Sequence, residues 1–383
     1  MCAINGITWS GEAVVRGMNA ETAHRGPDGT AVMAYPFATF GHNRLAIIDP
    51  DPRSNQPMVS EDGKFSIVFN GEIYNFKDIK QQLARKYNFK TESDTEVILA
   101  GYREWGNSVF SRLNGMFALA LYEHETGKIV LVRDPAGIKP LYLTKVSSGY
   151  AFSSEIKALL PLLSSRTVDT ESFELYMRTL YVPAPRTMFQ GVESLMPGTI
   201  TCLERGVRTT TAFSFSPTTI PLDYRDSQGL RKAVGDAVER QMLSDRPLGI
   251  YLSGGVDSSS VLASASRVRN GIDTYSISFE LEDTNDDEKF NTDARLAKRI
   301  ATHFGARHHE WRVTAPEVVP LLEKAAFHLD QPVANGTVVA QLALASHARE
   351  SVVVALTGDG GDEVFRGYER YRLSRLMEAY QRM

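Results

Sequence analysis

The sequence is poor in cysteine, with only Cys2 and Cys202 among 383 residues. Two cysteines cannot form a disulfide framework, so a reducing compartment is expected, and the cytoplasm fits best. No apolar run approaches the roughly 20 residues that a membrane-spanning helix needs. The first residues lack the basic and apolar stretches of a secretory signal. A net charge of −4 gives no reason to expect a nucleic-acid or membrane partner.

What the sequence does contain is the composition of a globular protein. Apolar residues make up 43% and charged residues 23%, which is enough apolar material for a sizeable core. At roughly 150 residues per domain, the length predicts two or three domains. The spacing of apolar and turn residues changes near residue 160 and again near residue 228, which divides the chain into three parts.

Residues 2–160 consist of short apolar runs separated by clusters of turn residues. The runs that we expect to form strands are 31–42, 45–49, 65–75, 117–123, 128–134, 140–146 and 149–155. Helical spacing of apolar residues predicts helices over 76–87 and 94–106. Many strands and few helices predict an α+β domain whose sheets pack face to face.

Residues 161–227 carry prolines at 183, 185 and 197 and show little periodicity, so we expect an ordered linker with a hairpin. From residue 228 to 383, strand and helix patterns alternate. The expected helices are 229–242, 258–271, 292–305, 316–329 and 363–383, and the expected strands are 248–252, 273–279, 308–313 and 351–357. Near-continuous apolar strands alternating with helices predict an α/β doubly wound parallel sheet, which binds ligands at the carboxyl ends of its strands. The acidic stretch 280–288 is expected to be a solvated loop.

Cys2 is a candidate nucleophile because it directly follows the initiator methionine. Removal of Met1, which the small residues Cys2 and Ala3 permit, would leave Cys2 with a free α-amine that titrates near roughly 8. That amine can act as the base for its own thiol, so no separate catalytic histidine is needed. The alternative is that Cys2 is an ordinary small residue in a first strand.

Four downstream segments, at 24–28, 41–49, 69–75 and 92–99, strengthen the catalytic interpretation. Asn70 and Gly71 offer a side-chain amide beside an unhindered N–H, which are suitable donors to an oxyanion. Arg44 and Asp94 have the charges needed to bind an amino acid by its α-carboxylate and α-amine. Alternatively, the Asn–Gly pair is only a hairpin turn, and the two charges lie on the surface.

These segments, together with 133–142 ("RDPAGIKPLY") and 153–159 ("SSEIKAL"), resemble the glutaminase domain of class II glutamine amidotransferases, the N-terminal-nucleophile type. The resemblance implies stacked antiparallel sheets between helices. It implies that Cys2 attacks the glutamine amide, that Asn70 and Gly71 hold the oxyanion, and that Arg25 shapes the pocket around the terminal amine. The residues that it implies for glutamine binding are Arg44, Ile48, Asn70, Gly71, Glu72 and Asp94.

A second motif, "SGGVDSS" at 253–259, joins an expected strand to an expected helix. Its glycines allow a close approach to an anion, which N–H groups, hydroxyls and a helix N-terminus then bind. It is not a Walker A site, because no G-x-x-x-x-G-K-[ST] is present. Asp257 inside a phosphate loop indicates a cation, most simply Mg²⁺. The alternative is a glycine-rich turn capped by serines.

The second motif resembles the pyrophosphate loop of enzymes that split ATP between its α and β phosphates. With it, the whole chain resembles the glutamine-hydrolysing asparagine synthetase family. The residues implied for ATP binding are Leu252, Ser253, Gly254, Gly255, Asp257, Ser258, Ile277, Thr357 and Gly358. Asp359 is implied in acceptor chemistry and Asp362 in pyrophosphate chemistry. Asp257 and Asp362 are implied in holding the metal, and 329–337 in shaping the acceptor pocket. Members often dimerise, so a homodimer is a further expectation.

The resemblance implies two coupled reactions: release of ammonia from glutamine, and amidation of an acceptor carboxylate, aspartate in the first instance, that Mg·ATP activates. Ammonia would travel along an apolar passage, for which 114–122 and 137–143 are candidate linings. Three departures stand against it: Asp359 replaces a glutamate, Arg366 replaces a glycine, and the family continues beyond residue 383 with a lysine for the adenylate step.

Two other functions therefore stay open. One is the same chemistry on another carboxylate acceptor, in a polysaccharide or natural-product pathway. The other is a truncated chain that acts as a bare glutaminase or a binding module. A zinc site at 308–310 ("HHE") is disfavoured, because three adjacent residues on a strand make a poor tetrahedral site.

Overall fold

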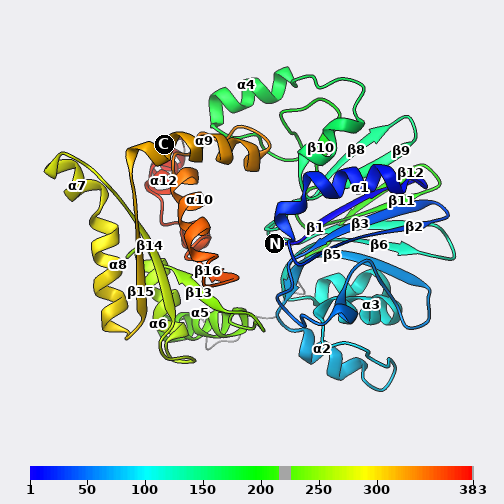
Figure 1. Cartoon of the computed structure of the whole chain (residues 1–383), viewed down its shortest axis with the longest axis horizontal. Helices are drawn as coiled ribbons and strands as arrows, with labels where there is room; N and C mark the ends of the chain where they lie inside the picture. Colours follow the sequence, from blue (N-terminus) through cyan, green and yellow to red (C-terminus); the bar gives the residue numbers. More distant parts are fainter. Residues whose placement is uncertain (215–225, 382–383) are drawn as a thin grey trace. The chain divides into compact units, whose positions relative to one another are not determined.

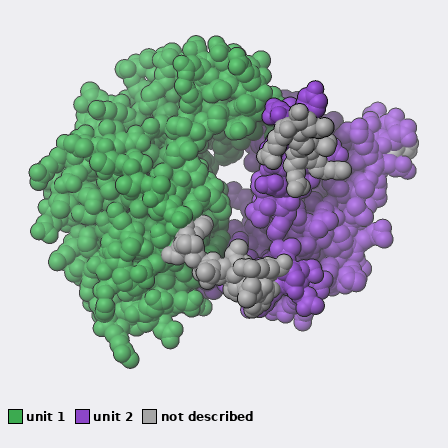
Figure 2. All heavy atoms as spheres, turned by 180° about the vertical axis from the view of Figure 1, so that it is seen from behind, with its two compact units in different colours: residues 1–219, 326–335 green, residues 220–325, 336–383 purple. Residues whose placement is uncertain are grey.

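The computed structural model describes residues 1–214 and 226–381 (Figure 1). The chain forms two compact units (Figure 2), one of residues 1–219 with 326–335 and one of residues 220–325 with 336–383. Within the described residues, no helix is both long and apolar enough to span a bilayer.

The first unit contains two six-stranded antiparallel sheets. One has the order β10-β8-β9-β1-β3-β2 and consists of β1 (Ala3–Ile7), β2 (Gly29–Tyr35), β3 (Ala38–Arg44), β8 (Tyr142–Val146), β9 (Gly149–Ser153) and β10 (Val192–Ser194). The other has the order β12-β11-β7-β6-β5-β4 and consists of β4 (Met58–Val59), β5 (Phe65–Ile73), β6 (Gly115–Glu123), β7 (Ile129–Arg133), β11 (Thr199–Glu204) and β12 (Val207–Ala212).

The two sheets pack face to face around one apolar core. Its members include Phe40 and Phe152 from the first sheet and Val68, Tyr122 and Leu131 from the second, all fully buried. Each of these side chains contributes roughly 1.5–3 kcal/mol through removal of apolar surface from water. The alternation of inward and outward side chains along each strand makes this core possible.

Helices cover the outer faces of both sheets (Figure 1). Helix α1 (Glu12–Glu21) packs Val15 and Met18 onto the first sheet. Helices α2 (Phe76–Leu83) and α3 (Asp94–Trp105) lie on the second sheet's side, where α3 contacts β5. The predicted fold class of stacked antiparallel sheets between helices is confirmed.

Three local predictions in the first unit differ from the structure. Residues 31–42 form the hairpin β2–β3 rather than one strand, because the chain turns at Pro36 and Phe37. Residues 45–49 are not a strand but a loop. Helix α1 was not expected, because Gly17 and a short apolar stripe weaken its helical signal.

The segment 161–227 is more regular than the expected linker. It contains helix α4 (Thr170–Thr179), which was not predicted, and the expected hairpin, which is β11–β12. Strand β10 pairs with β8 and β11 pairs with β7, so the segment extends both sheets. Strand pairing thus carries the first unit well past residue 160.

The second unit contains a parallel four-stranded sheet of order β15-β14-β13-β16. Its strands are β13 (Leu248–Tyr251), β14 (Asp273–Phe279), β15 (Arg307–Val313) and β16 (Val354–Leu356). The chain starts at β13, moves outward to β15 and returns to the other side of β13 as β16. The order therefore reverses between β13 and β16, which is where such sheets bind ligands.

Helices cover both faces of this sheet, so the predicted doubly wound fold is confirmed. Helices α5 (Ser227–Gln241), α6 (Val256–Ala265) and α8 (Thr292–His303) share a core with β13. Helix α10 (Thr337–Ala348), which was not predicted, packs on the opposite face against Tyr275. Helix α9 (Ala315–Leu329) matches its prediction.

Two predictions in this unit were wrong in detail. The expected loop at 280–288 contains helix α7 (Thr284–Phe290), which Asp283 caps by accepting the N–H of Asn285 at 2.7 Å. The expected helix from residue 363 is divided into α11 (Gly361–Phe365) and α12 (Glu369–Gln381). The break falls at Arg366, whose φ of 57° lies in the left-handed region that favours glycine.

Candidate active sites

Cys2 directly precedes β1, the strand that lies between β9 and β3 in the first sheet. Its sulfur accepts the N–H of Leu45 at 3.3 Å and lies 3.6 Å from the carbonyl oxygen of Leu45. Burial raises the pKa of the Cys2 thiol, and the hydrogen bond with Leu45 partly offsets that effect. The thiol therefore needs a nearby base before it can act as a nucleophile.

The residues predicted to bind glutamine gather around one small cavity of about 30 Å³. Its lining includes the predicted residues Cys2, Arg44, Ile48, Gly71, Glu72 and Asp94. These come from β1, β3, the following loop, β5 and α3. The structure therefore brings together segments that are far apart in the sequence. Asn70 is not in the lining but directly precedes Gly71 in β5.

Asn70 and Gly71 lie inside β5, paired with Ala118 and Phe117 of β6, so they do not form a hairpin turn. The side chain of Asn70 is 1% exposed, and neither its amide nitrogen nor its oxygen bonds to any residue that the structure describes. An unpaired buried amide costs roughly 1–3 kcal/mol, so a bound partner would stabilise it. Gly71 is required here, because a Cβ would lie 2.3 Å from the carbonyl oxygen of Met116.

Arg44 and Asp94 give the cavity a cation and an anion. The Arg44 guanidinium donates to the carbonyl oxygens of Asp49 (2.5 Å) and Asp51 (3.0 Å) and to the Asn55 amide oxygen (2.8 Å), all uncharged acceptors. Asp94 is the first residue of α3 and accepts the N–H of Ile73 at 3.0 Å. Burial raises its pKa to about 6. Neither residue is a surface charge, because Arg44 is 7% and Asp94 4% exposed.

A further cation near the thiol was missed by sequence reasoning. The ammonium of Lys139 is buried and lies 2.9 Å from the sulfur of Met1, and burial with the nearby Arg25 charge lowers its pKa to about 8. Asp134 shapes the turn that carries Lys139, because its buried carboxylate accepts the N–H groups of Ala136, Ile138 and Lys139, each at 3.0 Å. The sequence signal was an aspartate followed closely by a glycine turn.

The predicted phosphate loop follows β13 and leads into α6, with Gly255 at the N-cap. The hydroxyl groups of Ser253 and Ser258 lie 3.0 Å apart, and the N–H of Ser253 donates to Ser258 at 3.2 Å. Gly254 has a φ of +79°, and a Cβ on it would lie 2.6 Å from Cβ of Leu296. The loop is therefore held tightly against α8.

The second loop, after β16, packs against the first. A Cβ on Gly358 would lie 2.6 Å from the nitrogen of Ser258, and one on Gly361 would lie 2.5 Å from the carboxyl carbon of Asp257. Gly358 thus permits an approach to the main chain of the first loop that a side chain would block, and Gly361 leaves room for the carboxylate of Asp257. The two loops meet at the reversal of strand order between β13 and β16.

Around these loops lies a cavity of about 970 Å³ within the second unit. The predicted residues in its lining are Leu252, Ser253, Gly255, Asp257, Ser258, Ile277, Thr357, Gly358, Asp359 and Asp362. Gly254 is not in the lining, because it faces α8. Gly336 and Thr337, at the end of the segment predicted to shape an acceptor pocket, also line this cavity, as does Glu363.

The carboxylates of this cavity form a suitable donor set for Mg²⁺. Burial raises the pKa of Asp257, and the negative charges of Asp362 and Glu363 raise it further. Mg²⁺ is usually held by one or two carboxylates together with substrate phosphates. Asp257 and Asp362 fit that mode, although the described residues contain no cluster of three or more metal-ligating side chains.

The segment 308–310, which was disfavoured as a zinc site, lies on β15. Both ring nitrogens of His308 bond to side-chain hydroxyl groups, those of Thr274 (3.0 Å) and Ser276 (3.1 Å).

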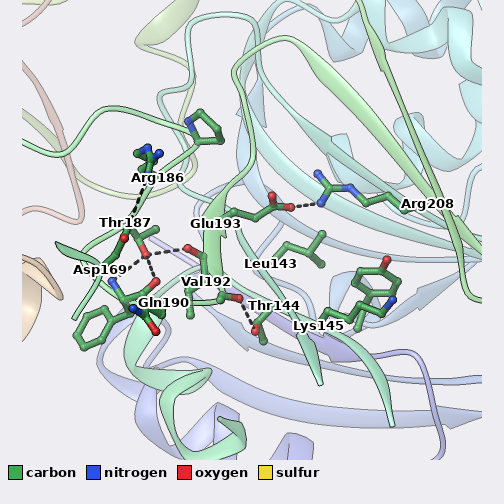
Figure 3. A pocket seen from close by; sticks show the side chains of 14 residues that line it. Leu143, Thr144, Lys145, Asp169, Arg186, Thr187, Gln190, Val192, Glu193 and Arg208 are labelled. Atoms are coloured by element: carbon green, nitrogen blue, oxygen red, sulfur yellow. Dashed lines mark hydrogen bonds and ion pairs between the residues drawn. The ribbon is translucent and has the colours of Figure 1, made fainter. Parts of the chain in front are cut away.

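A third hollow, of about 550 Å³, lies beside β10 and contains none of the predicted residues (Figure 3). Arg186 and Asp169 form an ion pair of 3.0 Å there, and Arg208 pairs with Glu193. Each of these two guanidinium groups therefore already has a carboxylate partner.

Comparisons with known proteins give a family for each part of the chain. Residues 1–214 match the family model described as a glutamine amidotransferase domain, and residues 229–382 match the one described as asparagine synthase. The chain belongs to the glutamine-hydrolysing asparagine synthetase family. It therefore joins a glutamine amidotransferase domain to an asparagine synthase domain.

Three relatives illustrate the likeness. Asparagine synthetase [glutamine-hydrolyzing] 1 of Bacillus subtilis is 33% identical over 376 residues, covering 97% of this chain and 58% of the relative. Asparagine synthetase [glutamine-hydrolyzing] 3 of the same organism is 31% identical, covering 92% and 59%. Amidase chyE of Penicillium rubens is 31% identical, covering 93% and 55%. The chain thus spans a little more than half the length of these relatives.

Proposed function

We propose that the chain is a glutamine-dependent amidotransferase that hydrolyses glutamine in its first unit and amidates an adenylated carboxylate in its second. The observation that carries the proposal is the small cavity lined by Cys2, Arg44 and Asp94, beside the amide of Asn70, which has no partner among the described residues. A nucleophile, an amino-acid clamp of both charges and an oxyanion donor are the groups that glutamine hydrolysis needs.

In the proposed first reaction, the α-amine of Cys2, free once Met1 is removed, takes the proton of the thiol. The sulfur then attacks the side-chain amide carbon of glutamine. Asn70 and Gly71 donate hydrogen bonds to the oxyanion. When the C–N bond breaks, the amine returns its proton to the leaving nitrogen, and ammonia departs. Water hydrolyses the thioester to glutamate and regenerates the thiol.

Arg44 and Asp94 orient the substrate in this reaction. The guanidinium would bind the α-carboxylate of glutamine, and the Asp94 carboxylate would bind its α-ammonium. Both side chains are buried and already held by neighbours, so little conformational entropy is lost on binding. Ile48 and Glu72, in the same lining, complete the enclosure.

In the proposed second reaction, an acceptor carboxylate attacks the α phosphorus of ATP and releases pyrophosphate, and ammonia then displaces AMP from the acyl carbon. The loop at 253–258 would bind the phosphates with its N–H groups and the N-terminus of α6. Leu252 and Ile277 would frame the adenine. Asp257 and Asp362 would hold Mg²⁺, which neutralises charge on the phosphates.

Aspartate is the proposed acceptor, because relatives named asparagine synthetase match over almost the whole chain. A second candidate is another carboxylate acceptor. A relative named an amidase is almost as similar, and Asp359, where the family usually has glutamate, changes the reach of one carboxylate by a methylene group. A glutaminase without synthetase activity is the third candidate.

Incubation of the purified chain with glutamine, Mg·ATP and aspartate, followed by mass spectrometry, separates the three candidates. Glutamate, pyrophosphate and asparagine are expected together. Glutamate without asparagine would exclude aspartate as the acceptor, and glutamate without pyrophosphate under any acceptor would leave only the glutaminase. Cys2→Ala should abolish glutamate release, whereas Cys202→Ala, a matched control in β11, should not. A Cys2→Ala variant that still hydrolyses glutamine would refute the proposed nucleophile.

A further inference from the structure

A short segment from the second half of the sequence belongs to the first unit. Residues 326–335 pack there. The ring of Phe327, in this segment, lies 4.8 Å from the ammonium of Lys157. The N–H of Ala334, also in the segment, donates to the carbonyl oxygen of Leu180 at 3.1 Å. The side chain of Gln331 also accepts the N–H of Met188 at 3.1 Å. The segment is therefore a fixed part of this unit.

Asp330 bonds to both the main chain and a side chain of the first unit. Its carboxylate accepts the N–H of Ile156 at 2.6 Å and lies 2.8 Å from the ammonium of Lys157. Its φ of 63° places it in the left-handed region, which aspartate and asparagine tolerate better than other side chains. Asp330 thus fixes both the main chain after Glu155 and the side chain of Lys157.

Lys157 passes this constraint to Glu155, whose carboxylate lies 2.5 Å from its ammonium. Glu155 also accepts hydrogen bonds from His24 (3.0 Å) and Arg25 (2.9 Å). Burial alone would raise the pKa of Glu155, but its three cationic or polar partners lower it to about 2. Glu155 is therefore an ionised carboxylate held from three sides.

Arg25 completes the connection to the thiol. Its Nε donates to the carbonyl oxygen of Cys2 at 2.9 Å, while its Nη1 is held by Glu155. A residue at a chain end has few covalent restraints, so hydrogen bonds to its main chain decide where its side chain points. The ion pairs that link Asp330, Lys157, Glu155 and Arg25 are largely buried, and removing one partner of such a pair is costly.

We propose that Asp330 is a positioning residue for Cys2, acting through Lys157, Glu155 and Arg25 on the main chain that carries the sulfur. Asp330 touches neither thiol nor substrate. The inference concerns the geometry of Cys2, and its effect on catalysis rests on the proposed glutamine hydrolysis. It assigns Asp330, one residue of the segment 329–337 that was predicted to shape an acceptor pocket, a role in placing the thiol.

The test compares Asp330→Asn with the wild-type chain in two measurements. The first is the rate at which iodoacetamide alkylates Cys2, followed by peptide mass spectrometry, with Cys202 as the internal control. Asparagine tolerates the left-handed backbone and can still accept the N–H of Ile156, so the fold should survive. The loss of the Asp330–Lys157 ion pair should loosen Lys157 and Glu155, and through them Arg25. The alkylation rate of Cys2 should then rise several-fold, with that of Cys202 unchanged.

The second measurement is glutamine hydrolysis by the full chain. Asp330→Asn should lower kcat about tenfold and leave KM within twofold, because Arg44 and Asp94 are untouched. Lys157→Met should have the same effect, and the double variant should be no worse than either single one. Asp169→Asn, which breaks the surface pair with Arg186 (Figure 3), should change neither measurement.

Unchanged alkylation of Cys2 in Asp330→Asn and Lys157→Met would overturn the proposal. So would a parallel rise at Cys202, which would indicate general loosening of the unit. If the wild-type chain releases no glutamate, the proposed function fails, but a rise confined to Cys2 would still support the positioning role.

Discussion

The N–H of Leu45 donates a 3.3 Å hydrogen bond to the sulfur of Cys2, which precedes it by 43 residues. This contact brings the loop after β3 against the first strand. Arg44 and Ile48, on either side of Leu45 in the chain, consequently line the same cavity as the sulfur. The donor also stabilises negative charge on sulfur, which offsets part of the cost of burying a thiolate.

Asn70→Ala should lower kcat for glutamine hydrolysis by about 10²–10³ with little change in KM, the size of effect typical of losing one oxyanion donor. The reason is that the amide of Asn70 is buried and unpaired among the described residues, so its hydrogen-bonding capacity is kept for a ligand. Steady-state kinetics would show this. Asn107→Ala, at an exposed position, is the control, and a loss that appears only in KM would argue against an oxyanion role.

Asp94 should make glutamine binding depend on pH. Its carboxylate must be ionised to hold an α-ammonium, and burial raises its pKa to about 6. KM for glutamine should therefore rise as the pH falls below about 6, approaching tenfold per unit. The Asp94→Asn variant should have a high KM with no such titration. A wild-type KM that stays flat from pH 7 to pH 5 would refute the assignment.

The raised pKa of Asp94 also predicts how the stability of the ligand-free protein depends on pH. A folded-state pKa above the unfolded value means that protonated Asp94 favours the fold, and this contribution is lost as the pH rises through about 6. Asp94→Asn should thus be at least as stable as the wild type at pH 7, while binding glutamine poorly. Thermal unfolding at pH 5 and pH 7 would measure the difference, and a variant that is clearly less stable at pH 7 would contradict it.

Asp257→Asn should lower the rate of pyrophosphate formation by about a hundredfold or more and leave the rate of glutamate release unchanged. Asp257 is destabilised by burial and by the charges of Asp362 and Glu363, which a bound Mg²⁺ would relieve. Calorimetric titration with Mg·ATP should also show that the variant binds Mg·ATP more weakly than the wild type. Asp236→Asn, which removes a carboxylate paired with Lys232 on α5, is the control. Equal binding by the Asp257→Asn and control variants would exclude a metal role.

Gly254→Ala should destabilise the second unit by about 2 kcal/mol. The residue has a φ of +79°, and the new methyl group would overlap Leu296. Gly235→Ala is a matched control in α5, where nothing beyond the neighbouring residues and backbone of the same helix lies within 4 Å of the new Cβ, and it should stabilise by roughly 0.5–1 kcal/mol. Urea unfolding of both variants would test the contrast.

Much of both sites could be predicted from the sequence because their residues are adjacent within short motifs. The loop at 253–258 needs only a strand before it and a helix after it, and both are local patterns. Cys2 and the Asn70–Gly71 pair follow from chemistry and position. The resemblance to the family then implied the binding and catalytic roles of these residues, which the spacing of the motifs alone left open.

What could not be predicted depends on contacts between distant segments. Lys139 is placed beside Met1 by a turn that Asp134 organises, and Asp330 reaches the first unit from the second half of the chain. Helix α10 was missed because its apolar residues lie on all sides, which gives no helical stripe to recognise. No spacing rule detects such long-range placement.

The pairing of β10 with β8 and of β11 with β7 has a practical consequence for anyone who expresses the first unit alone. A fragment cut at residue 160 would leave without partners those N–H and C=O groups of β8 and β7 that face β10 and β11, and open strand edges of that kind invite aggregation. Extending the fragment past β12 would cover both edges. It would still lack residues 326–335, so a soluble fragment of this length should be a poorer catalyst than the intact chain.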